Sequence, residues 1–187
     1  MFADGSVRGL NVLVHGATGG VGAIAAQMAH RDGARVFGSV RRKDQLAAAR
    51  ALGIEEAFLA SDPLLFSKLH EAAPDGIHRI AEIDFSDHIA LNARVLAIGG
   101  VVSSYYSSDP QPRIPYWQLG FADVTLRLLG SDDFPPQVKT DAAVALTDAL
   151  VQGDLRIDIA ARLPLADIAH AHELVEQSVG GRVLLEI

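Results

Sequence analysis

The 187-residue sequence contains no cysteine. This absence excludes disulfide bonds, thiolate nucleophiles and zinc sites with cysteine ligands. The sequence also lacks any run of about 18 apolar residues, so it predicts no membrane-spanning helix. Its first residues do not show the basic and then apolar pattern of a signal peptide. These absences lead us to expect a cytoplasmic protein.

Basic charge is scarce as well. The chain has 16 lysines and arginines against 23 acidic residues, which gives a formal net charge of −7. Proteins that bind nucleic acids usually present a basic face to the phosphates, so we exclude that class. Hydrophobic residues make up 49% and charged residues 21% of the chain, which excludes a mainly disordered state. We expect residues 1–187 to form one domain, or one domain with an appendage, that ends in a C-terminal helix and strand.

Strand and helix patterns alternate along the chain. The sequence predicts strands at 11–15, 35–40, 57–59, 77–83, 101–105, 124–129 and 182–187, and helices within 21–33, 44–52, 64–73, 87–96, 140–150 and 166–177. Alternating strands and helices form parallel sheets with helices on both faces. The sequence therefore predicts an α/β fold, a doubly wound parallel sheet of about six strands. The segment 109–115 contains three prolines and is predicted to be a loop.

A glycine-rich loop lies between the first predicted strand and the first helix. It reads Gly16-Ala17-Thr18-Gly19-Gly20-Val21-Gly22. Glycines at such a turn let the backbone approach a pyrophosphate, which is bound by the free N–H groups of the helix N-terminus. The spacing is a variant of the dinucleotide fingerprint, since Ala17 occupies one glycine position or the pattern starts at Gly16. The alternative is a glycine-rich turn without a ligand, but the strand–loop–helix context favours nucleotide binding.

The end of the second predicted strand indicates which dinucleotide is bound. NAD sites usually carry an acidic residue there, but this chain has none between Asp32 and Asp44. It has Ser39 and the basic run Arg41-Arg42-Lys43, which would attract a 2′-phosphate. The alternative is a solvated basic patch, although basic charge is unfavourable at the start of a helix. We predict NADP(H) as the cofactor.

Short-chain dehydrogenases use similar loops, and their catalytic members need a lysine four residues after a tyrosine. Here Tyr105, Tyr106 and Tyr116 are followed at that spacing by Asp109, Pro110 and Gly120. The catalytic short-chain class is therefore excluded, whereas a non-catalytic nucleotide-sensing relative stays open.

Several segments together resemble one family. They are Val12–Gly22 around the glycine loop, Leu52-Gly53-Ile54, Leu96–Val102 with its two glycines, and a tail of Leu163-Pro164-Leu165, Ala169–Glu173 and Gly181-Arg182-Val183. Over nearly its whole length the chain resembles the cofactor domain of zinc-free medium-chain dehydrogenases/reductases, in the quinone oxidoreductase (zeta-crystallin-like) branch.

The resemblance implies a six-stranded Rossmann domain and NADPH-dependent hydride transfer to a quinone or an α,β-unsaturated carbonyl. By matching position, the pyrophosphate would lie on Thr18–Gly22, and the 2′-phosphate would meet Ser39, Arg41 and Arg42. Tyr105, Tyr106, Ser107 and Ser108 would flank the nicotinamide ribose, and Leu128, Leu129 and Gly130 would close over the nicotinamide. His88 falls where this branch often has an asparagine that contacts the adenosine half.

The family also has a barrel-like domain that precedes the cofactor domain and builds much of the substrate pocket. We expect that domain to be absent here, because the first predicted strand starts near residue 11. We therefore expect the chain alone to bind NADP(H) but to reduce quinones poorly or not at all. The alternative is a non-catalytic NADP(H)-binding or sensing module.

Hydride transfer needs neither a protein nucleophile nor a metal, so we assign no catalytic residue and no metal site. His170 and His172 are two residues apart on a predicted helix and make a poor metal pair. The predicted edge strand 124–129 leads us to expect a homodimer, formed by pairing across a two-fold axis as in the family.

Three further sets of residues receive structural predictions. We expect Asp84 and Asp87 to cap the helix that follows them, with lining of the cleft as the alternative, and Asp132 and Asp133 to lie in a solvated loop. We expect Tyr116 and Trp117 to pack in a small satellite core, and the alternative is that they form a wall of a substrate cleft.

Overall fold

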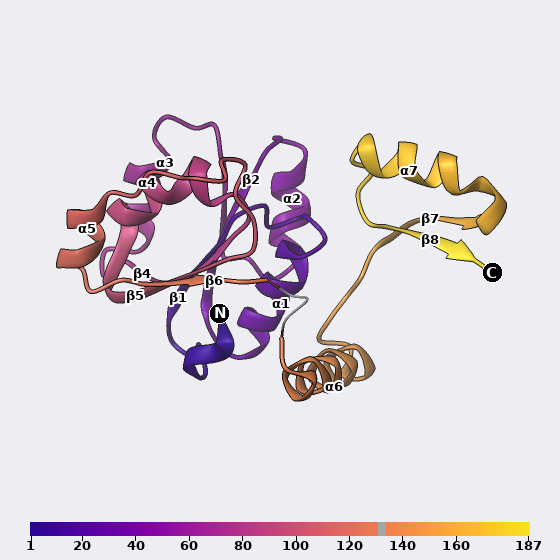
Figure 1. Ribbon diagram of the computed structural model, residues 1–187, viewed down its shortest axis with the longest axis horizontal. Coiled ribbons are helices and arrows are strands. Elements are labelled where there is room, and N and C mark those ends of the chain that lie inside the picture. Colours follow the sequence, from indigo (N-terminus) through magenta and orange to yellow (C-terminus); the bar gives the residue numbers. More distant parts are fainter. Residues whose placement is uncertain (131–133) are drawn as a thin grey trace.

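The computed structural model describes residues 1–130 and 134–187, and its main body is a six-stranded sheet in the order β3-β2-β1-β4-β5-β6 (Figure 1). All its pairings are parallel. The strands are β1 (Asn11–Val14), β2 (Arg35–Val40), β3 (Glu56–Leu59), β4 (Ile77–Glu82), β5 (Leu96–Ser104) and β6 (Thr125–Leu128). The predicted doubly wound α/β fold is confirmed. The order reverses between β1 and β4, and ligands bind at such a switch point, beyond the carboxyl ends of the strands.

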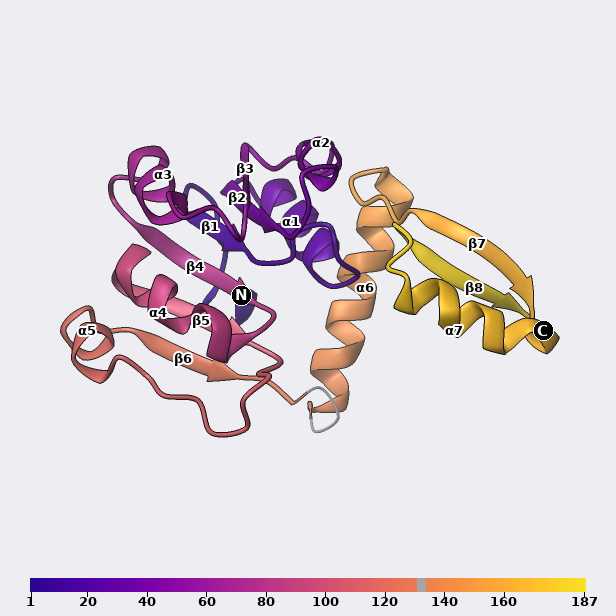
Figure 2. The same ribbon diagram turned by 90° about the horizontal axis from the view of Figure 1, so that it is seen from above.

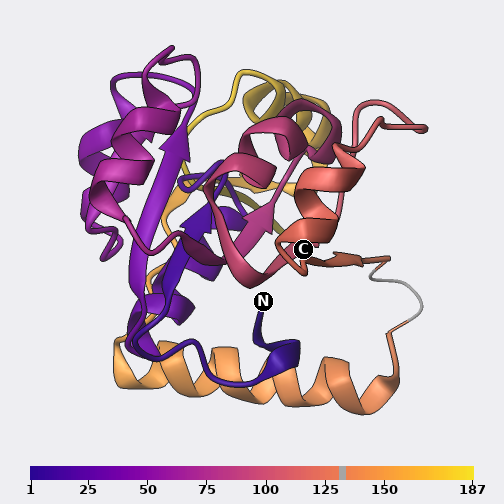
Figure 3. The same cartoon turned by 90° about the vertical axis from the view of Figure 1, so that its left-hand side faces the viewer.

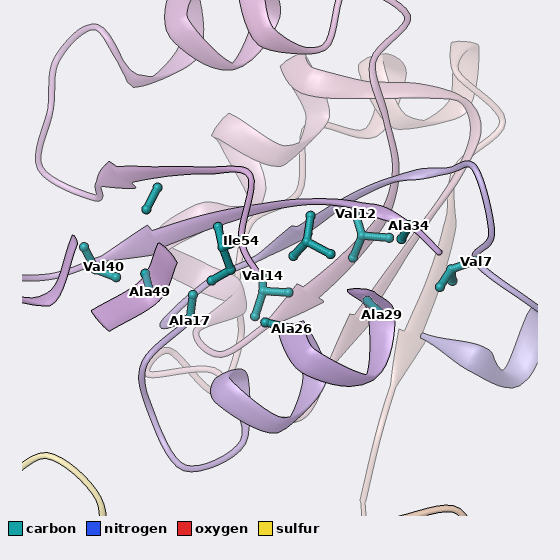
Figure 4. Packing of buried hydrophobic residues seen from close by; sticks show 12 residues of the cluster. Val7, Val12, Val14, Ala17, Ala26, Ala29, Ala34, Val40, Ala49 and Ile54 are labelled. Carbon is teal, nitrogen blue, oxygen red and sulfur yellow. The ribbon is translucent and has the colours of Figure 1, made fainter. Parts of the chain in front are cut away.

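The sheet is covered on both faces, as the apolar strands require. One face packs under α1 (Gly22–Arg31) and α2 (Gln45–Arg50), with small side chains at the contact. Figure 4 shows this layer, where Val12 and Val14 of β1 meet Ala26 and Ala29 of α1. Small residues let α1 lie close to the sheet, and this fixes the position of the loop before it.

The other face packs under larger side chains. It is covered by α3 (Leu65–Ala72), α4 (Phe85–Val95) and α5 (Tyr116–Phe121). Phe37 and Ile80 of the sheet contact Leu69 of α3 and Val95 of α4 in one buried cluster.

The C-terminal part forms a separate small unit beside the sheet. It consists of β7 (Ile159–Pro164), the short helix η3 (Leu165–Asp167), α7 (Ile168–Glu176) and β8 (Arg182–Glu186), with β7 and β8 in a parallel pair. We call it the C-terminal unit. The long helix α6 (Pro136–Gln152) connects it to the sheet (Figures 2 and 3). Buried Gln27 of α1 bonds both to the carbonyl and to the N–H of Arg156, which anchors the base of the unit on α1.

Several predictions differ from the structure. β5 begins at Leu96, earlier than expected, and α5, β7 and the short N-terminal helix η1 (Phe2–Asp4) were not predicted. The prediction of a satellite core at Tyr116 and Trp117 is wrong, because these side chains are 66% and 70% exposed. Asp132 and Asp133 lie outside the described residues. None of the helices in the described ranges is both long and apolar enough to cross a membrane.

Candidate cofactor site

The glycine loop turns sharply from β1 into α1. Gly16 has a φ of +61°, and its carbonyl accepts a hydrogen bond from the N–H of Gly19 at 2.8 Å. In residues 1–130 and 134–187, the N–H groups of Gly20 and Val21, just before α1, have no protein acceptor. Free N–H groups at a helix N-terminus form a site for an anion. The loop therefore fits the pyrophosphate of a dinucleotide.

The close packing of this loop explains two of its glycines. A Cβ on Gly22 would lie 2.2 Å from the carbonyl oxygen of Gly16, and a Cβ on Gly16 would lie 2.5 Å from Ile83. On the neighbouring strand, a Cβ on Gly38 would lie 2.8 Å from that of Ala17. At Gly22 the helix backbone lies directly against the backbone of Gly16, with no room for a side chain between them.

A groove runs beside this loop across the carboxyl edge of the sheet. It is lined by Gly16, Thr18, Gly19, Gly20, Val21, Gly22, Val40, Arg41, Gln45, Ile83 and Tyr105. The groove thus brings together the loop, Arg41 beyond β2 and Tyr105 beyond β5. Val40, Gln45 and Ile83 were not among the predicted residues.

A second hollow continues past Tyr105. It is lined by Phe85, Ser104, Tyr105, Tyr106, Ser107, Asp109, Pro110, Pro112, Leu128 and Leu129. Tyr105 lines both hollows, so it lies at their junction. The structure therefore brings five of the residues predicted for the nicotinamide end, Tyr105, Tyr106, Ser107, Leu128 and Leu129, around one space, whereas Ser108 and Gly130 do not line it. The proline-rich segment supplies another wall.

Of the three residues predicted to contact the 2′-phosphate, Arg41 alone lines the groove. Arg41 lines the groove, whereas Arg42 forms an exposed ion pair with Asp44 at 3.1 Å. Ser39 is buried, and its hydroxyl bonds to Nδ1 of His15 at 2.8 Å. A contact between Ser39 and a phosphate would require this internal hydrogen bond to break. Arg41 is therefore the predicted cation that already faces the groove.

A buried polar network lies directly beneath the loop. Glu82, at the end of β4, is fully buried and accepts hydrogen bonds from Nδ1 of His88 (2.7 Å), Nδ2 of Asn92 (2.6 Å) and the N–H of Asp84 (2.7 Å). Because the amide nitrogen of Asn92 faces Glu82, its oxygen faces Nε2 of His15, at 2.9 Å. His15 therefore carries its proton on Nε2, and the hydroxyl of Ser39 donates to Nδ1. Every member of the network has a partner.

The charges in this network follow from burial and pairing. Burial lowers the pKa of His15, which stays neutral. Burial alone would raise the pKa of Glu82, but the hydrogen bond and charge of His88 and the hydrogen bond from the N–H of Asp84 outweigh it and lower that pKa. Burial opposes the charge on His88, but the hydrogen bond and charge of Glu82 raise the pKa of His88. Below that raised pKa the network is a carboxylate–imidazolium pair beside a neutral histidine.

His15, Glu82 and His88 bring their ligand atoms within 4.8 Å of one another, a spacing that a metal site could use. The rings of His15 and His88, however, stack at 4.1 Å with an interplanar angle of 10°. Their lone pairs lie in parallel planes and do not converge on one ion, and both nitrogens of His15 are hydrogen-bonded. The geometry is that of a structural ion pair. His88, predicted to contact the adenosine half, lines neither hollow and bonds to Glu82 instead.

Asp84 does not cap α4 with its side chain. Its Oδ1 accepts hydrogen bonds from the hydroxyls of Ser86 and Ser108 and from the N–H of Ser108. Asp84 is nevertheless the N-cap residue of α4, as predicted, whereas Asp87 lies within the first turn of the helix. The side-chain bonds of Asp84 tie the segment after β5 to the start of α4. Since that segment lines the second hollow, Asp84 holds one of its walls in place.

Curated relatives match the chain over most of its length. A quinone oxidoreductase from Lama guanicoe is 29% identical over 184 residues, which cover 95% of this chain and 54% of that protein. Prostaglandin reductase 1 from Rattus norvegicus is 31% identical over 114 residues, which cover 57% of this chain and 35% of that protein. The chain spans about half the length of the quinone oxidoreductase it matches. No protein-family model matches.

Solved structures show the same likeness in three dimensions. A mycobacterial quinone oxidoreductase superposes with a TM-score of 0.86 at 26% identity, covering 96% of this chain and 57% of that one. A mycobacterial protein solved as a complex with NADPH superposes with a TM-score of 0.82 at 25% identity, covering 96% of this chain and 57% of that one. The sequence resemblance to quinone oxidoreductases is confirmed, and the chain is a homologue of these oxidoreductases over the half of their length that corresponds to it.

Proposed function

We propose that this chain is the NADP(H)-binding part of a reductase that transfers hydride to a quinone or an α,β-unsaturated carbonyl. The observation that carries the proposal is the groove, in which free N–H groups of the glycine loop and the guanidinium of Arg41 line the same space. The names of the relatives, quinone oxidoreductase and prostaglandin reductase 1, support the reaction class. The neighbour solved with NADPH supports the cofactor.

The residues of this chain would bind and orient the cofactor. The loop Thr18–Gly22 would hold the pyrophosphate through backbone N–H groups, and Arg41 would hold the 2′-phosphate. The walls around Tyr105 and Leu128 would direct the nicotinamide into the second hollow. The bound cofactor supplies the hydride, so the chain itself needs no nucleophile.

The cofactor assignment predicts that Arg41→Ala weakens NADPH binding about 10- to 100-fold, because one charge-assisted phosphate contact of about 1.5–3 kcal/mol is lost. NADH binding should hardly change, since NADH has no 2′-phosphate. Isothermal titration calorimetry with both cofactors measures the two effects. The control is Arg50→Ala, an exposed arginine at the end of α2 that does not line the groove.

Tighter binding of NADH than of NADPH by the wild-type chain would overturn the assignment. NADPH oxidation with a quinone, followed in the same samples, separates the two candidate functions. Turnover supports a reductase. Tight NADPH binding without turnover supports a binding or sensing module, or a chain that needs the remaining half of its relatives.

We also propose a homodimer through β6. This strand is at the edge of the sheet, it pairs with β5 alone among residues 1–130 and 134–187, and Leu128 at its end is 74% exposed. An open edge presents unpaired backbone groups that a second copy can satisfy. Sedimentation of the purified chain at micromolar concentration should show twice the mass of the 19.8 kDa monomer, whereas a single monomeric species would contradict the proposal.

A further inference from the structure

Arg182 connects the C-terminal unit to the glycine loop. It is the first residue of β8, and its Nη2 donates a hydrogen bond to the carbonyl oxygen of Gly20 at 2.9 Å. The guanidinium lies directly on the loop, because a Cβ on Gly20 would be 2.9 Å from Nη1. The two residues are 162 positions apart in the sequence. The fold therefore places this cation at the tip of the loop, where Gly20 leaves room for it.

The backbone around Arg182 is fixed from two directions. The N–H of Arg182 bonds to the carbonyl of Asp158 at 2.7 Å, at the start of the β7–β8 pair. Arg156 precedes Asp158 by two residues. Its N–H and its carbonyl bond to the side chain of buried Gln27 of α1, at 2.8 Å and 3.0 Å. Since α1 also begins at the glycine loop, the loop and the root of Arg182 are held by the same helix. The contact with Gly20 thus follows from the packing of the C-terminal unit.

Within the described residues, the guanidinium of Arg182 forms no ion pair with a carboxylate. Three other arginines near this unit pair with carboxylates: Arg31 with Asp154, Arg156 with Asp158, and Arg162 with Glu186. Arg182 is exposed, and in residues 1–130 and 134–187 the one hydrogen-bond partner of its guanidinium is the carbonyl of Gly20. A guanidinium has five N–H donors, so several are left for a ligand.

We propose that Arg182 is a further ligand for the cofactor pyrophosphate, acting with the free N–H groups of the glycine loop. This inference rests on the proposed function, since it assumes a dinucleotide in the groove. The N–H groups of Gly20 and Val21 supply partial positive charge, and Arg182 adds a full positive charge on the same turn. Guanidinium matches the geometry of phosphate oxygens. The C-terminal unit then takes part in cofactor binding through this one side chain.

The test compares NADPH and NADH, which share the pyrophosphate. Arg182→Ala should weaken both cofactors by a similar factor of about 5 to 30, the loss of one charge-assisted contact. Arg41→Ala, by contrast, should weaken NADPH alone. Arg182→Gln, which keeps most of the side-chain stem, should show the same equal loss, and Arg182→Lys a smaller one. Arg162→Ala, on the adjacent strand of the same unit, is the matched control and should bind both cofactors normally.

The outcomes separate this inference from the proposed function. If the wild-type chain binds neither cofactor, the proposed function fails and this inference fails with it. If the wild type binds and the Ala and Gln variants bind equally well, only the role of Arg182 is wrong. If the variants bound only NADPH more weakly, Arg182 would contact the 2′-phosphate and not the pyrophosphate, which would also overturn the proposal. Circular dichroism of each variant checks that the C-terminal unit stays folded.

Discussion

Glu82→Ala is expected to lower the free energy of unfolding by about 3–5 kcal/mol, the cost of breaking a buried ion pair. Glu82 is inaccessible to solvent and accepts three hydrogen bonds, from His88, Asn92 and Asp84. Without the carboxylate these donors face a cavity, and the imidazolium of His88 loses its counter-charge. Urea denaturation followed by circular dichroism measures the loss.

Two variants control this prediction. Glu82→Gln keeps the volume but turns an amide N–H₂ toward a donor, since Nδ2 of Asn92 already points at Glu82, and should cost about 1–3 kcal/mol. Glu71→Ala removes an exposed glutamate of α3 and should change stability by less than about 0.5 kcal/mol. If Glu82→Ala were as stable as Glu71→Ala, the network would contribute nothing to the fold.

The same network predicts how stability depends on pH. The lowered pKa of Glu82 gives stability that is present above its ordinary pKa and is lost as the pH falls through the folded value. The lowered pKa of His15 adds a loss on the acid side, because the unfolded chain takes up a proton that the folded chain does not. The raised pKa of His88 gives stability that is present below its ordinary value, about 6.5, and is lost as the pH rises through the folded value.

Glu82→Gln should therefore flatten the alkaline side of the profile. With the carboxylate gone, burial still lowers the pKa of His88, and only the smaller effects of the charges on Asp87 and Asp84 still raise it. The loss of stability at low pH that comes from the lowered pKa of His15 should remain in this variant. Thermal unfolding from roughly pH 4 to 9 checks both sides, and an unchanged alkaline slope in Glu82→Gln would show that His88 does not depend on Glu82.

The sheet could be predicted because its signals are local. β2 was predicted with the bounds 35–40 that the structure shows, since an apolar run between breakers specifies a strand by itself. β7 was not, because Ile159–Pro164 has an exposed pattern and depends on pairing with β8. The six residues of α5 follow a proline-rich loop and bury Leu119 against α4, a contact that no sequence period encodes.

The residues of the candidate site also fall into those that the sequence predicts and those that only the folded structure reveals. The glycine loop and Arg41 follow strand ends, and topology brings strand ends together, so the sequence could place them in one groove. The sequence predicts Ser39 as a cofactor contact from its place at the end of the second strand, and His88 from its position in the family resemblance. Their actual partners, His15 and Glu82, come from other strands and are visible only once the chain is folded. A signal did exist, because His15 directly follows β1 and Glu82 is the last residue of β4, so both polar residues lie at the carboxyl ends of neighbouring strands. Arg182 gave no comparable signal, since its partner lies 162 residues away.

Gly22→Ala should damage both stability and cofactor binding, although alanine favours a helix. The new Cβ would lie 2.2 Å from the carbonyl oxygen of Gly16 and 2.9 Å from its carbon, and both are backbone atoms. To make room, Gly16 must move, which breaks its hydrogen bond to Gly19, or α1 must lift from β1. We expect a loss of about 1–3 kcal/mol in unfolding free energy, typical of overpacking at a rigid contact.

The effect on binding separates a distorted loop from a merely weakened fold. A displaced loop no longer aligns the N–H groups of Gly20 and Val21, so NADPH and NADH should both bind about 10- to 100-fold more weakly. Gly120→Ala is the matched control, because Gly120 lies in α5, a Cβ there meets nothing within 4 Å, and its φ is not positive. That variant should be unchanged or slightly more stable, with normal binding. If Gly22→Ala bound both cofactors as well as Gly120→Ala does, the glycine loop would not be the pyrophosphate site, and the groove would need another ligand.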